Sequence, residues 1–312
     1  MERLDGSSAV PDALRGGIVA LGNFDGFHKG HQAVVGRAVA RARAEGRPAL
    51  VATFDPHPVR FFKPDVPPFR LTTLDQRERL FGAAGADAML VYQFNAELAQ
   101  VTAPDFVADY LASRAGVAGV VTGEDFTFGK GRGGNVDVLK LLGQANRLSV
   151  DAVAPVDDDG EPVSSSRIRD ALVAGDCDTA ARLLTRPFAI EGAVVHGDRM
   201  GHKLGYPTAN IPLDRYQRPR FGVYAVRARL AARTLEGVAN LGNRPMFDPP
   251  RELLEPYFFD FDEEIYGETL EVDLLAFIRD EHRFESLDAL KAQIGADAAE
   301  AKRRLAAAPP LA

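Results

Sequence analysis

Short apolar runs alternate with helix-like patterns through the first half of the chain. Strands are predicted at residues 18–21, 50–54, 88–91, 119–122 and 150–153. Residues 32–45 carry apolar side chains at the spacing of one helical face, and Gly46 follows where that helix should end. Helices are also predicted at residues 102–113, with Thr102 as the N-cap, and at residues 136–142. This alternation favours a parallel sheet covered by helices on both faces, whose ligands bind beyond the carboxyl ends of the strands.

The pattern changes near residue 186, beyond which short strands predominate. They are predicted at residues 189–195, 222–229, 237–241, 257–261 and 270–278. Ser286 is a suitable N-cap for one final helix, whose apolar side chains share a face. The sequence therefore predicts an α/β chain of two domains. Residues 1–185 form the parallel sheet, and residues 186–312 form a small β-barrel with a terminal helix.

Composition limits where the protein works and what it binds. A chain of 312 residues, 46% hydrophobic and 26% charged, suits two folded domains rather than a disordered chain. None of its apolar runs approaches the length of a membrane span. The single cysteine, Cys177, fits a reducing cytoplasm, and we interpret it as structural rather than catalytic. The formal net charge of -7 argues against DNA or RNA as a partner and leaves small anions as local ligands.

Residues 22–31, Gly-Asn-Phe-Asp-Gly-Phe-His-Lys-Gly-His, join the first predicted strand to the first predicted helix. Gly30 lets a phosphate approach the backbone, and a helix N-terminus offers unpaired N–H donors. His28 and His31 can then donate to triphosphate oxygens and stabilise the charge that develops as an α-phosphorus is attacked. The alternative is that one histidine caps the helix and the other packs on a loop. The position between a strand and a helix favours nucleotide chemistry.

A run of hydroxyls and guanidinium groups lies near the end of the same domain. Residues 164–169, Ser-Ser-Ser-Arg-Ile-Arg, precede a short predicted helix. The hydroxyls suit phosphate oxygens, and Arg167 and Arg169 can make bidentate contacts with them. A serine-rich N-cap with two solvated arginines explains the same residues equally well.

Two other loops follow predicted strands and therefore lie at the ligand-binding end of the sheet. Residues 123–134 carry Phe126 and Phe128, which either pack against a planar ring or anchor the loop to the core. Residues 53–58 contain two prolines, which either orient His57 or only turn the chain.

The second domain opens with a glycine-rich segment at residues 197–210. Its glycines recur at a spacing of four residues: Gly197, Gly201 and Gly205. A backbone of this kind can wrap a phosphate tail, although no Walker A motif is present. Thr208 and Asn210 point to the same side of an extended segment, and their neutral oxygens suit Mg²⁺ that also holds ATP phosphates. A glycine-rich turn before a strand remains the alternative.

Taken together, the ordered motifs resemble the bacterial bifunctional riboflavin kinase/FAD synthetase family. The first half carries four of them, at residues 22–31, 54–58, 123–129 and 164–169. The second half carries Pro-Thr-Ala-Asn at 207–210, Gly-Val-Tyr at 222–224 and Phe-Asp-x-x-x-Tyr-Gly at 261–267. The resemblance extends over nearly the whole chain, from about Gly17 to Arg304.

For the first half, the resemblance implies a Rossmann-like nucleotidyltransferase domain that transfers AMP from ATP to FMN and releases pyrophosphate. His28 and His31 would bind the triphosphate, and Asn23 would help to position the nucleotide. Arg167 and Arg169 would hold phosphate on a mobile loop. The implied flavin-binding positions are Asp125, Phe126, Phe128 and His57. Mg²⁺ on the triphosphate is the expected helper.

For the second half, the resemblance implies a flavokinase domain that phosphorylates the 5′-hydroxyl of riboflavin with ATP. Thr208 and Asn210 would coordinate Mg²⁺. Glu255 matches the family's catalytic glutamate and would accept the hydroxyl proton as the phosphoryl group arrives. Glu252 is the rival carboxylate three residues away.

Three positions depart from the family pattern. His202 stands where the family usually has arginine, Met246 replaces a threonine, and Glu263 replaces a turn glycine. None of these changes touches Thr208, Asn210 or Glu255, so we expect a working kinase whose rate equals or falls below that of the family.

Two other functions remain open at this stage. The nucleotidyl-transfer domain alone is compatible with another acceptor, such as a phosphocholine- or pantetheine-type substrate, but an attached flavokinase-like domain favours flavin. A flavin-binding regulatory protein without catalysis is the other alternative. The expected partners are the small molecules ATP, riboflavin and FMN, with FAD as product.

Overall fold

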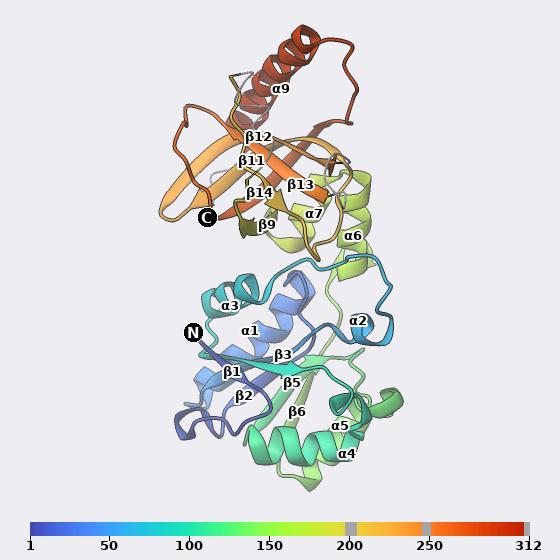
Figure 1. Ribbon diagram of the computed structural model, residues 1–312. Coiled ribbons are helices and arrows are strands. Elements are labelled where there is room, and N and C mark those ends of the chain that lie inside the picture. The colour runs from blue at the N-terminus through green and yellow to red at the C-terminus, as the bar shows by residue number, and fades with distance from the viewer. Residues whose placement is uncertain (197–204, 245–250, 309–312) are drawn as a thin grey trace. The chain divides into compact units, whose positions relative to one another are not determined.

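The computed structural model describes residues 1–196, 205–244 and 251–308 (Figure 1). The chain divides into two compact units, which we call unit 1 and unit 2. Unit 1 comprises Met1–Pro67 and Thr73–Ser164, and unit 2 comprises Pro68–Thr72 and Ser165–Ala312. Within the described ranges, no helix is both long enough and apolar enough to span a membrane.

Unit 1 is built on a six-stranded parallel sheet in the order β1-β4-β3-β2-β5-β6. The strands are β1 (Glu2–Asp5), β2 (Ile18–Leu21), β3 (Ala49–Asp55), β4 (Ala88–Gln93), β5 (Gly119–Gly123) and β6 (Ser149–Val153). The predicted parallel sheet is confirmed. The edge strand β1 was missed because its residues are polar and mostly exposed, so they show no buried strand pattern.

Helices cover both faces of this sheet (Figure 1). They are α1 (Lys29–Ala44), α2 (Pro58–Phe62), α3 (Leu74–Ala83), α4 (Ala103–Asp105), its π-helical continuation Phe106–Arg114, and α5 (Val136–Ala145). Alternate residues of β2 serve the two faces: Ile18 and Ala20 pack with α1, whereas Val19 and Leu21 pack with the π-helix and α5. A short hairpin, β7 (Asp157–Asp158) and β8 (Glu161–Pro162), closes the unit.

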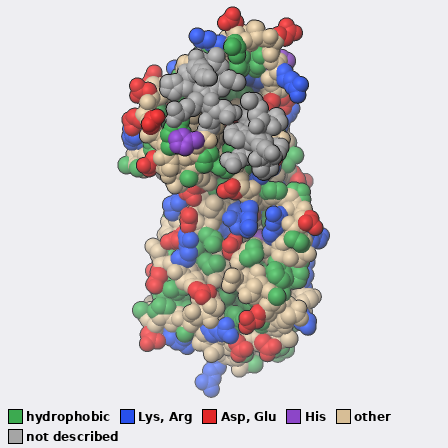
Figure 2. All heavy atoms as spheres, viewed as in Figure 1, with side chains coloured by type: hydrophobic (Ala, Val, Ile, Leu, Met, Phe, Trp, Pro, Cys, Tyr) green, Lys and Arg blue, Asp and Glu red, His purple; other side chains and the backbone are tan. Residues whose placement is uncertain are grey.

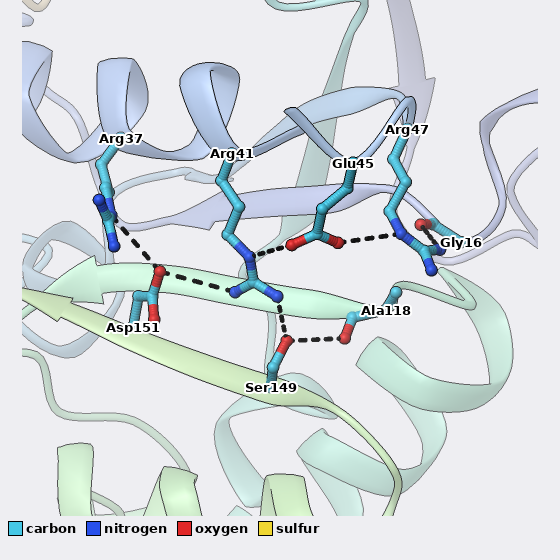
Figure 3. Close-up of polar contacts among 8 residues, drawn as sticks. All are labelled: Gly16, Arg37, Arg41, Glu45, Arg47, Ala118, Ser149 and Asp151. Atoms are coloured by element: carbon cyan, nitrogen blue, oxygen red, sulfur yellow. Dashed lines mark hydrogen bonds and ion pairs between the residues drawn. The ribbon is translucent and has the colours of Figure 1, made fainter. Parts of the chain in front are cut away.

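An ion-pair network links α1 to the edge strand β6 (Figure 3). Arg41 donates to the Ser149 hydroxyl at 2.5 Å and pairs with Glu45 at 2.6 Å. Asp151 lies 3.5 Å from Arg37 and 3.6 Å from Arg41. These contacts fix the helix that begins at the histidine motif.

Unit 2 contains a six-stranded antiparallel sheet in the order β10-β13-β12-β11-β14-β9. Its strands are β9 (Phe188–Ala193), β10 (Ile211–Pro212), β11 (Gly222–Leu230), β12 (Arg233–Arg244), β13 (Arg251–Phe258) and β14 (Thr269–Arg279). The Val195 N–H donates to the Asn210 carbonyl at 2.9 Å, which nearly closes the sheet into the predicted barrel. Helices α6 (Ser165–Ala174) and α7 (Cys177–Leu184) precede the barrel, and α9 (Leu287–Ala307) follows it.

Most local predictions agree with these elements, although several differ in type or position. Thr102 and Ser286 cap their helices as predicted. The helix after Thr102, however, becomes a π-helix from Phe106. The strand predicted at residues 257–261 lies earlier, in β13, and ends at Phe258. On the face shown in Figure 2, acidic and basic side chains are interspersed over the described residues of both units.

Candidate active sites

The connectivity of unit 1 defines where a ligand should bind. From β2 the chain continues to β3 and β4 on one side and later crosses to β5 and β6 on the other side. The order therefore reverses between β2 and β5, and such a switch point leaves a crevice beyond the carboxyl ends of the strands. The loop that carries His28 follows β2, and the loop of residues 124–134 follows β5. The sequence motifs thus flank the expected crevice.

His28 and His31 are brought together at the N-terminus of α1. Their rings stack with centroids 3.6 Å apart and an angle of 21° between the planes. His28 is the N-cap, and its Nδ1 accepts a hydrogen bond from the His31 N–H at 3.3 Å. A neutral imidazole that accepts at Nδ1 carries its proton on Nε2, the tautomer that can donate to phosphate. Capping and phosphate binding are therefore compatible roles for His28.

A buried polar network supports the loop that follows β2. Arg77 of α3 lies 3.1 Å from the carboxylate of Asp25, and both side chains are 3% exposed. Arg77 also donates to the Thr53 hydroxyl at 3.3 Å, and Thr53 donates to the Asn23 carbonyl at 2.8 Å. The network joins β3 and α3 to the loop after β2. Sequence reasoning missed it because no local pattern relates residues so far apart.

One residue of the loop after β2 and one residue of the first turn of α1 offer a polar group and space to a ligand. The side-chain oxygen of Asn23 is buried and accepts no hydrogen bond from any described residue. A Cβ at Gly30 would lie 3.2 Å from the His28 ring and 3.6 Å from the Val163 carbonyl. Gly30 therefore keeps the backbone of the first turn of α1 open between His28 and the segment around Val163.

The predicted flavin-binding residues lie in two loops. His57 caps α2, where its Nδ1 accepts the Val59 N–H at 3.2 Å. Asp125 is exposed just beyond β5. Phe126 stacks on Phe128 at 5.7 Å, and Phe128 is buried with 7% exposure. Phe128 therefore anchors the loop to the core, which leaves Phe126 and Asp125 nearer its surface.

An exposed aromatic side chain near His57 was not singled out from the sequence. Phe62 of α2 is 63% exposed although it packs edge-on against Phe61 and Phe94. Phe94 directly follows β4, so this cluster lies beyond the carboxyl ends of β3 and β4. An aromatic face of this kind suits a planar ring. The signal available in the sequence was the Phe-Phe pair that follows the His57 motif.

Arg167 and Arg169 lie on α6, which begins at Ser165, so the expectation that they lie on a loop ahead of the helix is wrong. Helix α6 belongs to unit 2. The guanidinium of Arg169 donates to the Phe69 carbonyl at 2.8 Å and lies 5.1 Å from the centroid of the Phe69 ring. Arg169 thus holds the segment Pro68–Thr72, which is part of the same unit.

In unit 2, strand register brings the predicted kinase residues together. Thr208 pairs with Tyr257, and Ile211 pairs with Leu254. Asn210 therefore lies opposite Glu255. Paired residues of antiparallel strands project to the same face, as do residues two apart on one strand. Thr208, Asn210 and Glu255 consequently share one face, with Asn210 buried at 7% exposure.

The neighbouring carboxylates have distinguishable environments. Glu252 pairs with Arg218 at 2.6 Å, so its charge is already engaged in an ion pair. Glu255 is partly exposed and lies across from Asn240 of β12. Asn240 donates to Glu281 at 3.1 Å. Asn240 was not singled out from the sequence, and it continues the row formed by Asn210 and Glu255.

Some predicted positions are not described. Gly197, Gly201, His202 and Met246 lie outside the described residues. Gly205 has φ +84°, a conformation that favours glycine. Glu263, which departs from the family pattern, accepts two hydrogen bonds from Arg233 at 2.7 and 2.9 Å. The glutamate therefore forms an ion pair that a glycine at this position could not form.

Comparison with known proteins gives matches along most of the chain. The FAD synthetase family model matches residues 10–167, and the riboflavin kinase model matches residues 184–305. A relative from Pseudomonas fluorescens, named bifunctional riboflavin kinase/FMN adenylyltransferase, is 41% identical over 92% of this chain and 93% of its own. A Bacillus subtilis relative with the same name is 36% identical over 92% of each chain.

A solved structure is also similar in fold. The crystal structure of a protein from Streptococcus pneumoniae, named a macrolide-efflux protein, superposes with a TM-score of 0.86. It is 33% identical in sequence, and the match covers 97% of this chain and 99% of that one.

Proposed function

The chain belongs to the bifunctional riboflavin kinase/FMN adenylyltransferase family, and on that premise we propose which residues carry its two reactions. The enzyme phosphorylates riboflavin with ATP to give FMN. It then transfers AMP from a second ATP to FMN, giving FAD and pyrophosphate. The FAD synthetase match lies in the first half of the chain and the riboflavin kinase match in the second.

For adenylyl transfer, the observation that carries the proposal is the stacked pair of His28 and His31 at the N-terminus of α1. We assign both as donors to the triphosphate, with the side chain of Asn23 positioning the nucleotide. The attacking group is an ionised phosphate of FMN, so little base catalysis is needed. Positioning and stabilisation of the developing charge then supply most of the rate.

The acceptor flavin is assigned to the loops beyond β3, β4 and β5. Phe62, Phe126 and His57 offer flat faces there, and Asp125 offers a carboxylate. Phe128 supports Phe126 from the core side. Arg167 and Arg169 remain assigned to substrate phosphate, with Arg169 in addition holding Phe69.

For the kinase reaction, the shared face of Thr208, Asn210 and Glu255 carries the proposal. Mg²⁺ fits this face, because a hydroxyl and an amide oxygen are weak neutral ligands that leave room for ATP phosphates. When bound, the ion would neutralise charge on the transferred phosphoryl group. Glu255 accepts the proton of the riboflavin 5′-hydroxyl as that oxygen attacks. Gly197, Gly201 and Gly205 are assigned to the ATP phosphates.

The lone thiol supports a proposal for the cell compartment. Cys177 is the only cysteine in the sequence, and a reducing cytoplasm is the compartment that we propose for both reactions.

One incubation tests both activities of the purified protein. Riboflavin, ATP and Mg²⁺ are supplied, and the flavins are resolved by chromatography over time. We expect FMN first and FAD after it. FMN without FAD would contradict the proposed adenylyl-transfer site. It would favour the alternative that the first domain transfers a nucleotide to another acceptor. FAD from supplied FMN without any FMN from riboflavin would contradict the kinase site. Loss of FAD synthesis alone in a His28→Ala variant would assign that step to the histidine motif.

A further inference from the structure

A lysine at the start of α1 is not used by the roles assigned so far. Lys29 lies between the two histidines and is the first residue of the helix. Its Nζ forms a 2.6 Å ion pair with Asp158 of the hairpin β7–β8. The Lys29 side chain is 32% exposed, whereas that of Asp158 is 10% exposed. The lysine is therefore held next to the proposed triphosphate site, with part of its surface open to solvent.

The position of Lys29 is electrostatically unfavourable for a cation. The N-terminus of a helix carries partial positive charge, and lysine there repels it. The first turn of α1 contains no acidic residue that would compensate. A lysine at this point needs an anion beside it, and either the Asp158 carboxylate or a substrate phosphate can serve.

The hairpin that supplies Asp158 also approaches the phosphate-binding turn. The Val163 N–H donates to the Val156 carbonyl at 2.8 Å, which closes the base of the hairpin. The Val163 carbonyl lies 3.6 Å from the place where a Cβ would stand on Gly30. Ser164 follows directly and begins the run of serines. The ion pair therefore joins the histidine motif to the segment that leads into the serine run.

We propose that Lys29 binds the triphosphate during adenylyl transfer. Asp158 is a positioning residue that holds Lys29 in the free enzyme, and a phosphate of ATP takes the place of the Asp158 carboxylate when the nucleotide binds. Lysine has three N–H donors on a flexible stem, so Nζ can turn from a carboxylate to a phosphate oxygen. Loss of Asp158 should then free Lys29 for ATP. The inference rests on the proposed site at His28 and His31.

The direction in which Asp158→Asn changes the KM for ATP separates this inference from a purely structural role of the ion pair. If Asp158 competes with ATP for Lys29, the isosteric change Asp158→Asn lowers the KM for ATP. If the pair only holds the hairpin in place, the same change loosens the site and raises the KM. Lys29→Met should raise the KM for ATP by about tenfold, the effect of removing one hydrogen bond to a charged group. It should also weaken product inhibition by pyrophosphate, which carries the same phosphate chemistry.

The test uses the full-length enzyme with FMN and ATP as substrates. Initial rates of FAD formation give KM and kcat for Lys29→Met, Asp158→Asn and the double variant. Asp151→Asn is the matched control, because it removes one carboxylate that pairs with Arg37 and Arg41 farther along the same helix (Figure 3). Riboflavin phosphorylation by each variant and its thermal melting curve report whether the protein is folded.

The expected result is a higher KM for Lys29→Met, a lower KM for Asp158→Asn, and no further effect of Asp158→Asn when Lys29 is already methionine. An unchanged KM in Lys29→Met, or a higher KM in Asp158→Asn, would overturn the inference. A wrong assignment of the triphosphate site to His28 and His31 would give a different result. In that case His28→Ala and His31→Ala would synthesise FAD at the normal rate.

Discussion

Asp25 and Arg77 form an ion pair that is buried on both sides, with 3.1 Å between the Oδ1 and Nη2 atoms. Asp25 belongs to the loop after β2, and Arg77 belongs to α3. Arg77 also reaches the Thr53 hydroxyl of β3. Three segments thus meet directly below the turn that carries His28, and the precision of that turn depends on their contact.

Removal of one partner should be costly because the other charge stays buried. For Arg77→Met we expect a loss of roughly 3–5 kcal/mol in the free energy of unfolding, as for other broken buried pairs. The rate of FAD synthesis should fall more than the rate of riboflavin phosphorylation, since the loop after β2 loses its support. Urea unfolding followed by circular dichroism, together with both rates, checks this expectation.

The chain offers a matched control in an exposed arginine of β1 that pairs with the same helix. Arg3 pairs with Asp75 and Glu78 of α3, and its side chain is 35% exposed. Arg3→Met should cost less than about 1 kcal/mol, because exposed ion pairs contribute little. FAD synthesis should be unaffected. Similar losses for Arg3→Met and Arg77→Met would argue against a special role for the buried pair.

Gly30 provides a steric prediction for the histidine motif. In Gly30→Ala the new Cβ would lie 3.2 Å from Cε1 and 3.3 Å from Nδ1 of His28, so the ring must shift by a few tenths of an ångström. The KM for ATP in FAD synthesis should rise, because His28 would no longer be aligned with a phosphate oxygen. Steady-state kinetics with FMN in excess measures the change.

Gly36 is the corresponding control, six residues farther along α1. A Cβ at Gly36 meets no atom within 4 Å. Gly36→Ala should therefore raise the free energy of unfolding by roughly 0.5–1 kcal/mol through helix propensity and leave the kinetics unchanged. A kinetic defect in Gly36→Ala as large as that in Gly30→Ala would show that the effect comes from the helix rather than from His28.

Local signals explain what could be predicted from the sequence. The strand, turn and helix around His28 lie within a few tens of residues, so apolar spacing and turn chemistry were sufficient. The helix nevertheless begins at Lys29, ahead of the predicted residue 32, because the His28 side chain caps it. The spacing of Thr208 and Asn210, two residues apart on an extended segment, is a local signal of the same kind.

Long-range contacts explain what could not be predicted. The partner of Asp25 lies 52 residues away, and that of Lys29 lies 129 residues away. Neither separation has a periodicity that a sequence pattern can reveal. The π-helix at Phe106–Arg114 was also missed, because the i+5 hydrogen bonding that defines it has no sequence signal comparable to the 3.6-residue period.

Cys177 gives a prediction about pH. Burial raises the pKa of this thiol from its ordinary value of 9.0 to about 12. Below pH 9 the thiol is protonated in both the folded and the unfolded chain, so the full stability is present. Between about pH 9 and 12 the unfolded chain loses the proton first, so this contribution to stability should decline as pH rises.

Two measurements check this behaviour. Iodoacetamide should label native Cys177 far more slowly at pH 8 than it labels the urea-unfolded chain, because the native thiol is buried and protonated. In Cys177→Ala the decline in stability above pH 9 should become shallower. Rapid labelling of the native protein would mean that the thiol is accessible.

Glu255 carries the sharpest prediction for the kinase reaction. In Glu255→Gln the side chain keeps its size but can no longer accept the proton of the riboflavin hydroxyl. The rate of FMN formation should fall by about 10²–10⁴-fold, the usual contribution of a general base. FAD formation from supplied FMN should be unchanged, because Glu255 has no assigned role in that reaction. Chromatographic rates with each flavin separate the two effects.

Glu252→Gln is the matched control, three residues away on the same strand. Glu252 is engaged by Arg218 at 2.6 Å, and its side chain is 35% exposed. Its loss should therefore lower stability slightly, by less than about 1 kcal/mol, and should leave most of the kinase rate. A large kinase defect in Glu252→Gln combined with a near-native rate in Glu255→Gln would transfer the role of base to Glu252. That outcome would also mean that the Arg218 ion pair opens when riboflavin binds.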